Sequence, residues 1–209
     1  MSIPLVNMIK GDCMDFMRSK PNRHYDLAIV DPPYGININV NMGRRKGDKP
    51  SGYKKFAGED KSIPSAEYFR ELMRISKNQI VWGGNYMTEH LFPSPCWLVW
   101  DKGFSEEMSF AQVEMAWTSF KSSAKKFDRN PNQPGRIHPT QKPVQLYKWI
   151  LMNYANKGDK ILDTHGGSGS IALACHELGF DLDWIELDKE YYESAMKRFK
   201  EYTSQTRMF

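Results

Sequence analysis

The chain contains the segment Lys160–Ser170, KILDTHGGSGS, in which a short apolar strand leads into a glycine-rich turn and then into a helix. Glycines let the backbone come close to a ligand, and the first turn of a helix offers free N–H groups. A pyrophosphate-binding turn has the spacing GxGxxG, which this segment lacks, and Asp163 at the strand end would repel a phosphate. The same carboxylate suits a ligand that carries a positive amine.

A second acidic residue, Glu186, follows at the end of the next predicted strand, about twenty residues downstream. An acidic side chain at this place bonds ribose hydroxyls in nucleotide-binding sheets. A nucleoside with an amino-acid tail and no phosphate fits both acids, and S-adenosylmethionine is such a ligand. A tight turn in a flavodoxin-like or NAD-binding sheet is the alternative at this point.

The apolar run Leu27–Val30 ends in the stiff tip Asp31-Pro32-Pro33-Tyr34. Proline fixes φ and removes an N–H donor, so carbonyl acceptors at this tip stay free. A carboxylate, carbonyls and an aromatic ring together suit a planar ring that bears an NH2 group, because the amine donates two hydrogen bonds while the ring stacks on Tyr34. An ordinary proline-bounded loop is the alternative for this tip taken alone.

Basic residues gather in two segments without helical or strand periodicity. Residues 36–62 hold seven basic and three acidic residues, and residues 119–136 hold five and one, whereas all 209 residues together have a net charge of +4. Basic loops with interleaved aromatic residues are typical of surfaces that bind a polyanion, although solvated loops without a ligand have the same composition. The predicted DNA contacts are Arg44, Arg45, Lys46, Lys54, Lys55, Lys121, Lys125, Lys126 and Arg129.

Composition favours an ordinary globular protein, with 40% hydrophobic and 26% charged residues. No apolar run is long enough to cross a bilayer, the N-terminus lacks signal-peptide features, and the three cysteines and five histidines show no metal-ligand spacing. We therefore expect a cytoplasmic protein with no membrane span and no metal, built as a single domain over residues 1–209.

Apolar periodicity predicts strands that alternate with helices, which indicates an α/β sheet with helices on both faces. The predicted strands are 6–10, 26–30, 79–82, 97–100, 111–118, 160–163 and 183–187. The predicted helices are 12–19, 65–77, 85–90, 144–154, 168–178 and 189–202. Residues 36–62 and 119–139 are expected to be loops.

Together these pieces resemble the β-group of DNA amino-methyltransferases over nearly the whole chain, from Gly11 to about Arg198. In that family a DPPY motif precedes an HPTQKP-like segment and then the cofactor glycines, and Asp31–Tyr34, His138–Pro143 and Asp163–Ser170 follow in the same order here. The family's cofactor motif usually reads like DPFxGSGT, so Thr164 and His165 replace its proline and phenylalanine.

The resemblance implies the α/β fold of S-adenosylmethionine-dependent methyltransferases, a doubly wound mixed sheet of seven strands. It implies methyl transfer to the N6 amine of an adenine flipped out of double-stranded DNA. The catalytic residues are then expected to be Asp31, Pro32, Pro33 and Tyr34. The expected cofactor site comprises Asp12, Cys13, Thr140, Lys142, Asp163, His165, Gly167, Ser168, Gly169, Glu186 and Leu187.

The resemblance further implies a target-recognition region, expected at about residues 101–136 and assisted by the 36–62 loop. It implies, in many members, a homodimer. The cell is expected to be bacterial, archaeal or phage-infected, where such enzymes act in restriction–modification or alone.

Four alternatives stay open on the sequence. Cytosine-N4 methylation uses a similar amine, although the cytosine enzymes more often carry serine in place of Asp31, and adenine in RNA is a further substrate. An NAD-dependent oxidoreductase conflicts with the glycine spacing, and a catalytically silent DNA-binding module conflicts with the intact Asp31 tip.

Overall fold

The computed structural model describes residues 3–36, 60–104, 111–131 and 141–206. Eight strands form one mixed sheet in the order β1-β8-β7-β2-β3-β5-β4-β6. Of these strands, β5 runs antiparallel to its neighbours β3 and β4, and all other adjacent pairs are parallel. The strands are β1 (Val6–Lys10), β2 (Tyr25–Val30), β3 (Ser76–Trp82), β4 (Trp97–Asp101), β5 (Val113–Thr118), β6 (Lys125–Asp128), β7 (Lys160–Asp163) and β8 (Asp181–Glu186).

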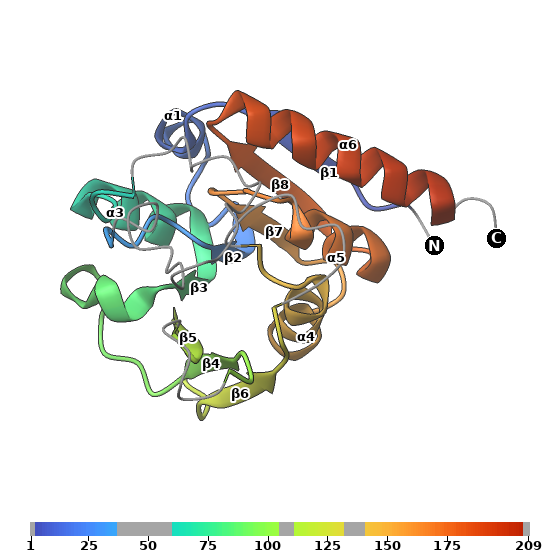
Figure 1. Cartoon of the computed structure of the whole chain (residues 1–209). Helices are drawn as coiled ribbons and strands as arrows, with labels where there is room; N and C mark the ends of the chain where they lie inside the picture. The colour runs from blue at the N-terminus through green and yellow to red at the C-terminus, as the bar shows by residue number, and fades with distance from the viewer. Residues whose placement is uncertain (1–2, 37–59, 105–110, 132–140, 207–209) are drawn as a thin grey trace.

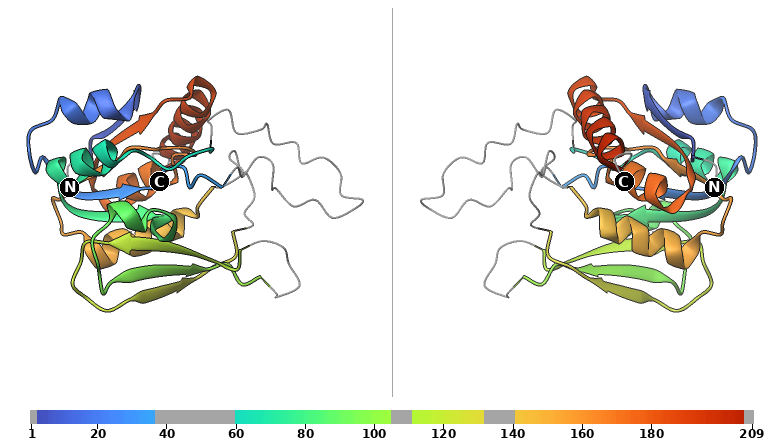
Figure 2. Two further views of the ribbon diagram at one scale, coloured as in Figure 1. Left: turned by 90° about the vertical axis from the view of Figure 1, so that its left-hand side faces the viewer. Right: turned by 90° about the vertical axis from the view of Figure 1, so that its right-hand side faces the viewer.

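Helices cover both faces of this sheet, as the sequence predicts. Figure 1 shows α1 (Cys13–Arg18) and α3 (Ala66–Ile75) on one side, and α4 (Val144–Tyr154) and α5 (Ser170–Leu178) on the other. The long α6 (Lys189–Thr206) packs beside α5, and two short 3-10 helices, η1 (Gly84–Tyr86) and η2 (Thr88–His90), follow β3. In the side views of Figure 2, β4, β5 and β6 form the lower end of the sheet, and β8 and α6 lie at the upper end.

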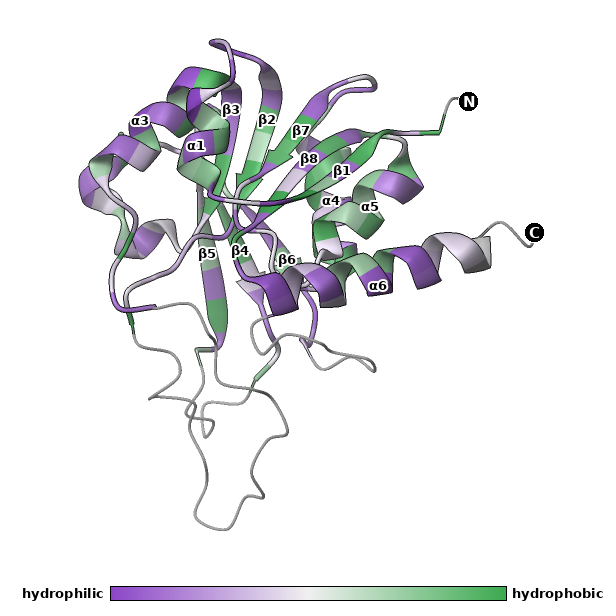
Figure 3. Cartoon of the chain, turned by 90° about the horizontal axis from the view of Figure 1, so that it is seen from above, coloured by the Kyte–Doolittle hydropathy of each residue, from purple (hydrophilic) through white to green (hydrophobic). Residues whose placement is uncertain are grey.

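The sheet divides the hydrophobic core into two clusters, because successive side chains of a strand point to opposite faces. Leu27 and Ile29 pack with α4 and α5, whereas Ala28 and Val30 pack with α1 and α3. Strands buried on both faces read as nearly continuous apolar runs, which explains why β2 was recognisable from its sequence. Figure 3 shows the hydrophobic colour concentrated in the central strands and much hydrophilic colour on α3 and α6.

The expected count of seven strands is wrong, since the structure has eight. The additional strand β6 lies inside residues 119–139, which were expected to be loop. It is an edge strand in which Lys125, Lys126 and Asp128 are exposed and Phe127 alone packs against the core. A single inward residue leaves no alternating pattern, and lysines are common on edge strands because they discourage further pairing.

Other boundaries differ by a few residues. The helix predicted over residues 65–77 ends at Ile75, and β3 begins directly at Ser76. The segment predicted as one helix at 85–90 forms the two 3-10 turns instead. Asp12 caps α1, since its carboxylate accepts the backbone N–H of Met14 at 2.7 Å.

None of the described helices combines the length and apolar composition that a bilayer-spanning helix needs. Within the same ranges, histidine, cysteine and carboxylate side chains form no group of three that could bind a metal ion.

The close contact between Gly166 and the Trp184 indole yields a prediction on stability. A Cβ added at Gly166 would lie 1.8 Å from Trp184 Cε2, and the indole is fully buried. Overpacking of a core costs about 1–3 kcal/mol. We expect Gly166→Ala to lower the free energy of unfolding, measured by urea denaturation, by at least about 1 kcal/mol. Gly11→Ala is the matched control, since no atom lies within 4 Å of its added Cβ; an equal loss in both variants would contradict this account.

Candidate active site

The two sequence motifs meet at one edge of the sheet. Strands β2 and β7 are parallel neighbours, with Leu27 opposite Ile161 and Ala28 opposite Leu162. Because the carboxyl ends of parallel strands lie at the same edge, the Asp31 tip and the turn after Asp163 are adjacent. Strands β1 and β8 end at this edge too, with Lys10 paired to Glu186, so Asp12 joins the same region.

At the Asp31 tip, the side chains of Asp31 and Tyr34 are joined by a hydrogen bond, and this pair with its surroundings is called the Asp31 corner below. The Tyr34 hydroxyl donates to Asp31 Oδ1 at 2.6 Å. Gly83 follows β3 with a φ of +69°, and a Cβ there would lie 2.2 Å from Tyr34 Cε1, so a glycine is needed for the ring to sit here. Tyr34 also stacks on Tyr86, with ring centroids 5.4 Å apart, and Tyr86 is 46% exposed.

Lys142 occupies the centre of this corner. Its ammonium lies 2.6 Å from Asp31 Oδ2, 3.0 Å from Glu114 Oε2 and 3.2 Å from the Tyr34 hydroxyl. Glu114 in β5 also pairs with Lys102, 2.6 Å away. Burial alone would raise the pKa of Glu114, but the two lysines lower it to about 2. Burial likewise opposes the charge of Lys142, yet Asp31 and Glu114 raise its pKa above the usual 10.5.

The glycine turn is tied to the end of β8. Gly167 has a φ of +52°, and its N–H donates to Glu186 Oε2 at 2.8 Å. The second carboxylate oxygen accepts the N–H of Asp188 at 2.8 Å. Burial raises the pKa of Glu186 despite these bonds. The turn is braced from α6, because Arg198 donates to the Ser168 carbonyl at 2.8 Å.

Asp163 lies buried at the end of β7. Its Oδ1 accepts the backbone N–H of His165 at 3.0 Å. Burial raises its pKa to about 8; the charges of Asp31 and Glu186 add to this effect, and the His165 bond and Lys142 oppose it. A carboxyl with such a pKa is partly protonated at neutral pH and becomes a carboxylate when a cation arrives beside it.

The two residues that depart from the usual family motif form a bonded unit. Thr164 Oγ1 lies 2.9 Å from His165 Nδ1 and 2.7 Å from the Tyr68 hydroxyl of α3. The His165 and Tyr68 rings meet edge to face, with centroids 5.3 Å apart. Burial lowers the pKa of His165 to about 4, so the imidazole is uncharged at pH 7.

Asp12 and Cys13 adjoin Glu186. The Gly11 N–H donates to the Glu186 carbonyl at 3.0 Å. Burial, followed by the neighbouring Asp12 charge, raises the pKa of the Cys13 thiol to about 12, which excludes a reactive thiolate at neutral pH.

The family model described as DNA methylase, N6_N4_Mtase, matches residues 81–197, more than half of the chain. The chain belongs to this family of N6/N4 DNA methylases. The match includes Glu114, Lys142, the glycine turn and Glu186, while the Asp31 corner precedes it. The predicted recognition as a DNA amino-methyltransferase is therefore confirmed.

Two relatives align with most of this chain. The type II methyltransferase M.HinfI of Haemophilus influenzae is 24% identical, over 94% of this chain and 69% of its own. The putative methylase YubD of Escherichia coli strain K12 is 25% identical, over 91% and 88%.

Solved structures confirm the fold. The M1.HpyAVI–SAM complex has a TM-score of 0.63 at 18% identity and covers 93% of this chain and 98% of that chain. The cytosine-N4-specific PvuII DNA methyltransferase has a TM-score of 0.62 at 13% identity and covers 97% and 92%. The predicted methyltransferase sheet is thus correct in type, with one strand more than expected.

Enzymes of this family use S-adenosylmethionine, the predicted cofactor, and the methylase has residues that fit it. No atom lies within 4 Å of a Cβ built on Gly11, and only the His165 carbonyl, at 4.0 Å, approaches one built on Gly167, so a ligand can approach both backbones. Leu187, beside the half-buried Glu186, is 68% exposed and offers an apolar contact for a purine.

The structure places Lys142 away from its expected role, because its ammonium bonds the Asp31 corner. The expected cofactor residue Thr140 lies outside the described residues, as do the predicted DNA contacts Arg44, Arg45, Lys46, Lys54 and Lys55. The other predicted cofactor residues, on the turn after β7 and at the ends of β1 and β8, gather at one edge.

The predicted DNA contacts on β6 lie at two different ends of that strand. Arg129 follows its carboxyl end, at the edge of the candidate site, where its N–H donates to the Asp101 carbonyl at 2.9 Å. Lys126 pairs with Asp128 at 2.7 Å. Lys121 and Lys125 lie at the amino end, and Lys125 bonds Asn153 at the end of α4. Arg129 and Lys121 thus lie at opposite ends of β6.

Sequence reasoning missed Glu114, Lys102 and Tyr68. Glu114 is a charged residue in an otherwise apolar strand, which is a usable signal for a buried role. Lys102 and Tyr68 carry no such signal, because their partners are distant in the sequence.

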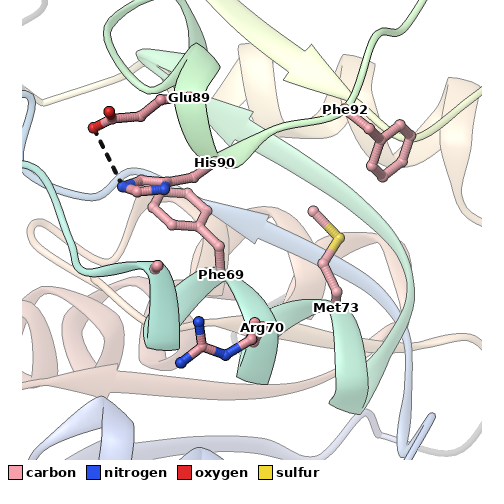
Figure 4. Close-up of a pocket in the computed structure, with 7 residues that line it drawn as sticks. Phe69, Arg70, Met73, Glu89, His90 and Phe92 are labelled. Atoms are coloured by element: carbon pink, nitrogen blue, oxygen red, sulfur yellow. Dashed lines mark ion pairs between the residues drawn. The ribbon is translucent and has the colours of Figure 1, made fainter.

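A groove of about 430 Å³ lies between α3 and η2 (Figure 4). Glu89 and His90 form an ion pair at its rim, 3.4 Å apart. It is lined by Ala66, Phe69, Arg70, Met73, Glu89, His90 and Phe92, none of which is a predicted site residue.

The partly buried imidazole of His165 yields a prediction on protonation. Since burial lowers the pKa of His165 to about 4, its ring should stay neutral from about pH 5.5 to 8. NMR signals of the His165 ring are expected to stay constant over this range in the folded protein. In the urea-unfolded chain they should titrate near 6.5. A titration midpoint near 6.5 for the His165 ring in the folded protein would contradict a neutral imidazole.

Proposed function

We propose that the chain transfers a methyl group from S-adenosylmethionine to the N6 amine of adenine in double-stranded DNA. The proposal depends on one observation, the convergence of the Asp31 corner with the glycine turn and Glu186 at the carboxyl edge of adjacent parallel strands. An amine held by Asp31 and a donor held by the turn are then neighbours, and alignment of this kind contributes roughly 7–11 kcal/mol to a transfer.

The cofactor supplies a methyl group on a positively charged sulfonium. Glu186 accepts hydrogen bonds from the ribose hydroxyls with lone pairs that Gly167 and Asp188 leave free. Asp163 ionises and holds the amino group. The open backbone at Gly167 admits the amino-acid tail, and the neutral His165 ring forms a wall that does not repel the positive charge.

The base is held by the Asp31 corner. Flipping it out of the duplex costs a few kcal/mol, and stacking on the aromatic surface of Tyr34 and Tyr86 returns about 1–3 kcal/mol. Asp31 and the Pro32 carbonyl each accept one N–H of the amine. These bonds favour a pyramidal nitrogen whose lone pair points at the methyl group. Transfer is direct: the N–CH3 bond forms as the S–CH3 bond breaks, S-adenosylhomocysteine leaves, and the methylated amine releases one proton.

Asp31 supports adenine as the target, because the cytosine enzymes that the chain resembles more often carry serine at this place. Cytosine N4 is the second candidate, because the cytosine-N4-specific PvuII DNA methyltransferase has a TM-score of 0.62, close to the 0.63 of the M1.HpyAVI–SAM complex. DNA contacts by the predicted basic residues and a homodimer belong to the same proposal.

The product of the reaction tests the function. Unmethylated genomic DNA is incubated with the protein and isotope-labelled cofactor, then digested, and the nucleosides are identified by mass spectrometry. We expect labelled N6-methyldeoxyadenosine. Asp31→Ala should yield no product while its calorimetric affinity for the cofactor stays within about threefold of wild type. Labelled N4-methyldeoxycytidine would establish the second candidate, and unlabelled nucleosides would refute both.

The raised pKa of Asp163 predicts a pH dependence of cofactor binding. Below its pKa of about 8 the carboxyl is protonated in the free protein, and a cationic ligand must displace that proton. The affinity should therefore rise by up to about tenfold per pH unit toward pH 8 and level off above it. Calorimetry in buffers of different ionisation enthalpy should show proton release.

Asp163→Asn should bind more weakly with a flatter pH profile. Asp181→Asn, which changes a carboxylate at the opposite end of β8, is the control and should retain the wild-type profile. An unchanged profile in Asp163→Asn would remove Asp163 from the cofactor site.

A further inference from the structure

The buried ammonium of Lys142 already has a set of protein partners. Its side chain is 2% exposed, and oxygens of Asp31, Glu114 and Tyr34 lie within 3.2 Å of its Nζ. An ammonium has three N–H donors and no acceptor. Two of these donors bond Asp31 Oδ2 and the Tyr34 hydroxyl, and Glu114 Oε2 lies 3.0 Å away as an ion-pair partner, so the ammonium is directed at the Asp31 corner.

Glu114 holds Lys142 from the side opposite to Asp31. It projects from β5, and its other oxygen is held by Lys102, which directly follows β4. The charges of Lys102, Glu114, Lys142 and Asp31 alternate in sign and cancel. Lys142 is the buried member, whereas the Lys102, Glu114 and Asp31 side chains are 13–21% exposed, so the carboxylates on its two sides offset the desolvation of the Lys142 ammonium and hold it in place.

We propose that Lys142 and Glu114 are positioning residues for methyl transfer, with Lys142 locking the Asp31 carboxylate and Tyr34 hydroxyl and Glu114 locking Lys142. This inference depends on the proposed function, in which Asp31 receives the target amine. A carboxylate has about four lone-pair sites. Tyr34 takes one on Oδ1 and Lys142 takes one on Oδ2, which fixes the carboxylate plane and leaves lone pairs in defined directions for the amine.

The first test compares two lysine–aspartate pairs. Lys142→Met should lower the single-turnover rate of methyl transfer to unmethylated genomic DNA by about 100-fold, since misplacement of a reacting group by about 1 Å costs this much. The matched control is Lys77→Met. Lys77 also lies 2.6 Å from an aspartate, Asp26, but this pair is at the amino ends of β2 and β3, and Lys77 is 49% exposed. The control should react at the wild-type rate.

Cofactor affinity separates positioning from cofactor binding without reference to activity. Calorimetric titration of Lys142→Met with S-adenosylmethionine should give a dissociation constant within about threefold of wild type. A rise of tenfold or more would mean that Lys142 binds the cofactor, as the family resemblance implies, and would overturn the inference.

A double variant separates positioning from mere structural support. Lys142→Met removes the positive charge between Glu114 and Asp31, so the melting temperature of this variant should fall. Glu114→Gln added to Lys142→Met restores the charge balance of the set, with Lys102 and Asp31 as its remaining charges, and the melting temperature should recover. The transfer rate should stay about 100-fold low, because Lys142 no longer fixes Asp31 Oδ2. Recovery of the rate together with stability would show a structural role only.

The single variant Glu114→Gln should show an intermediate rate with unchanged cofactor affinity. A wild-type rate in both Lys142→Met and Glu114→Gln would overturn the inference while leaving the proposed function standing. Absence of transfer by the wild-type protein, in spite of cofactor binding, would instead remove the proposed function and this inference with it.

Discussion

The parallel pairing of β2 with β7 is the interaction on which the candidate site depends. It sets Leu27 opposite Ile161 and Ala28 opposite Leu162, so the chain leaves both strands at the same edge. A slip by one residue would move every side chain of a strand to the opposite face of the sheet, so the register decides which helices each apolar residue contacts. The pairing of β1 with β8 adds Asp12 and Glu186 to the same edge.

The carboxylates at this edge of the sheet have different surroundings, and therefore different pKa values and charges. Glu114 has two lysines beside it, which lower its pKa to about 2 and keep it charged. Asp163 is more deeply buried, its hydrogen bond comes from a backbone N–H, and burial raises its pKa to about 8. The protein thus supplies the positive charge for one acid, while the other is suited to a cationic ligand.

The sequence predicted the fold well where burial imposes a pattern. The runs that form β2 and β7 and the start of α4 were recognisable because their apolar residues face packed neighbours. Strand β6 was missed because an edge strand with one inward residue, Phe127, has no periodicity to recognise. The glycine turn and the Asp31 tip were recognisable because glycine and proline restrict or free the backbone of the residues beside them, which is a local effect. The pairing of Lys142 with Asp31 could not be predicted, since 111 residues separate them and the contact exists only once the sheet has formed.

A crystal structure of the protein with S-adenosylmethionine tests the central claim most directly. The account predicts the ribose at Glu186, the amino group at Asp163 and the sulfonium methyl group directed at the Asp31 carboxylate. A cofactor bound at another edge of the sheet, or bound here with its methyl group turned away from Asp31, would contradict it.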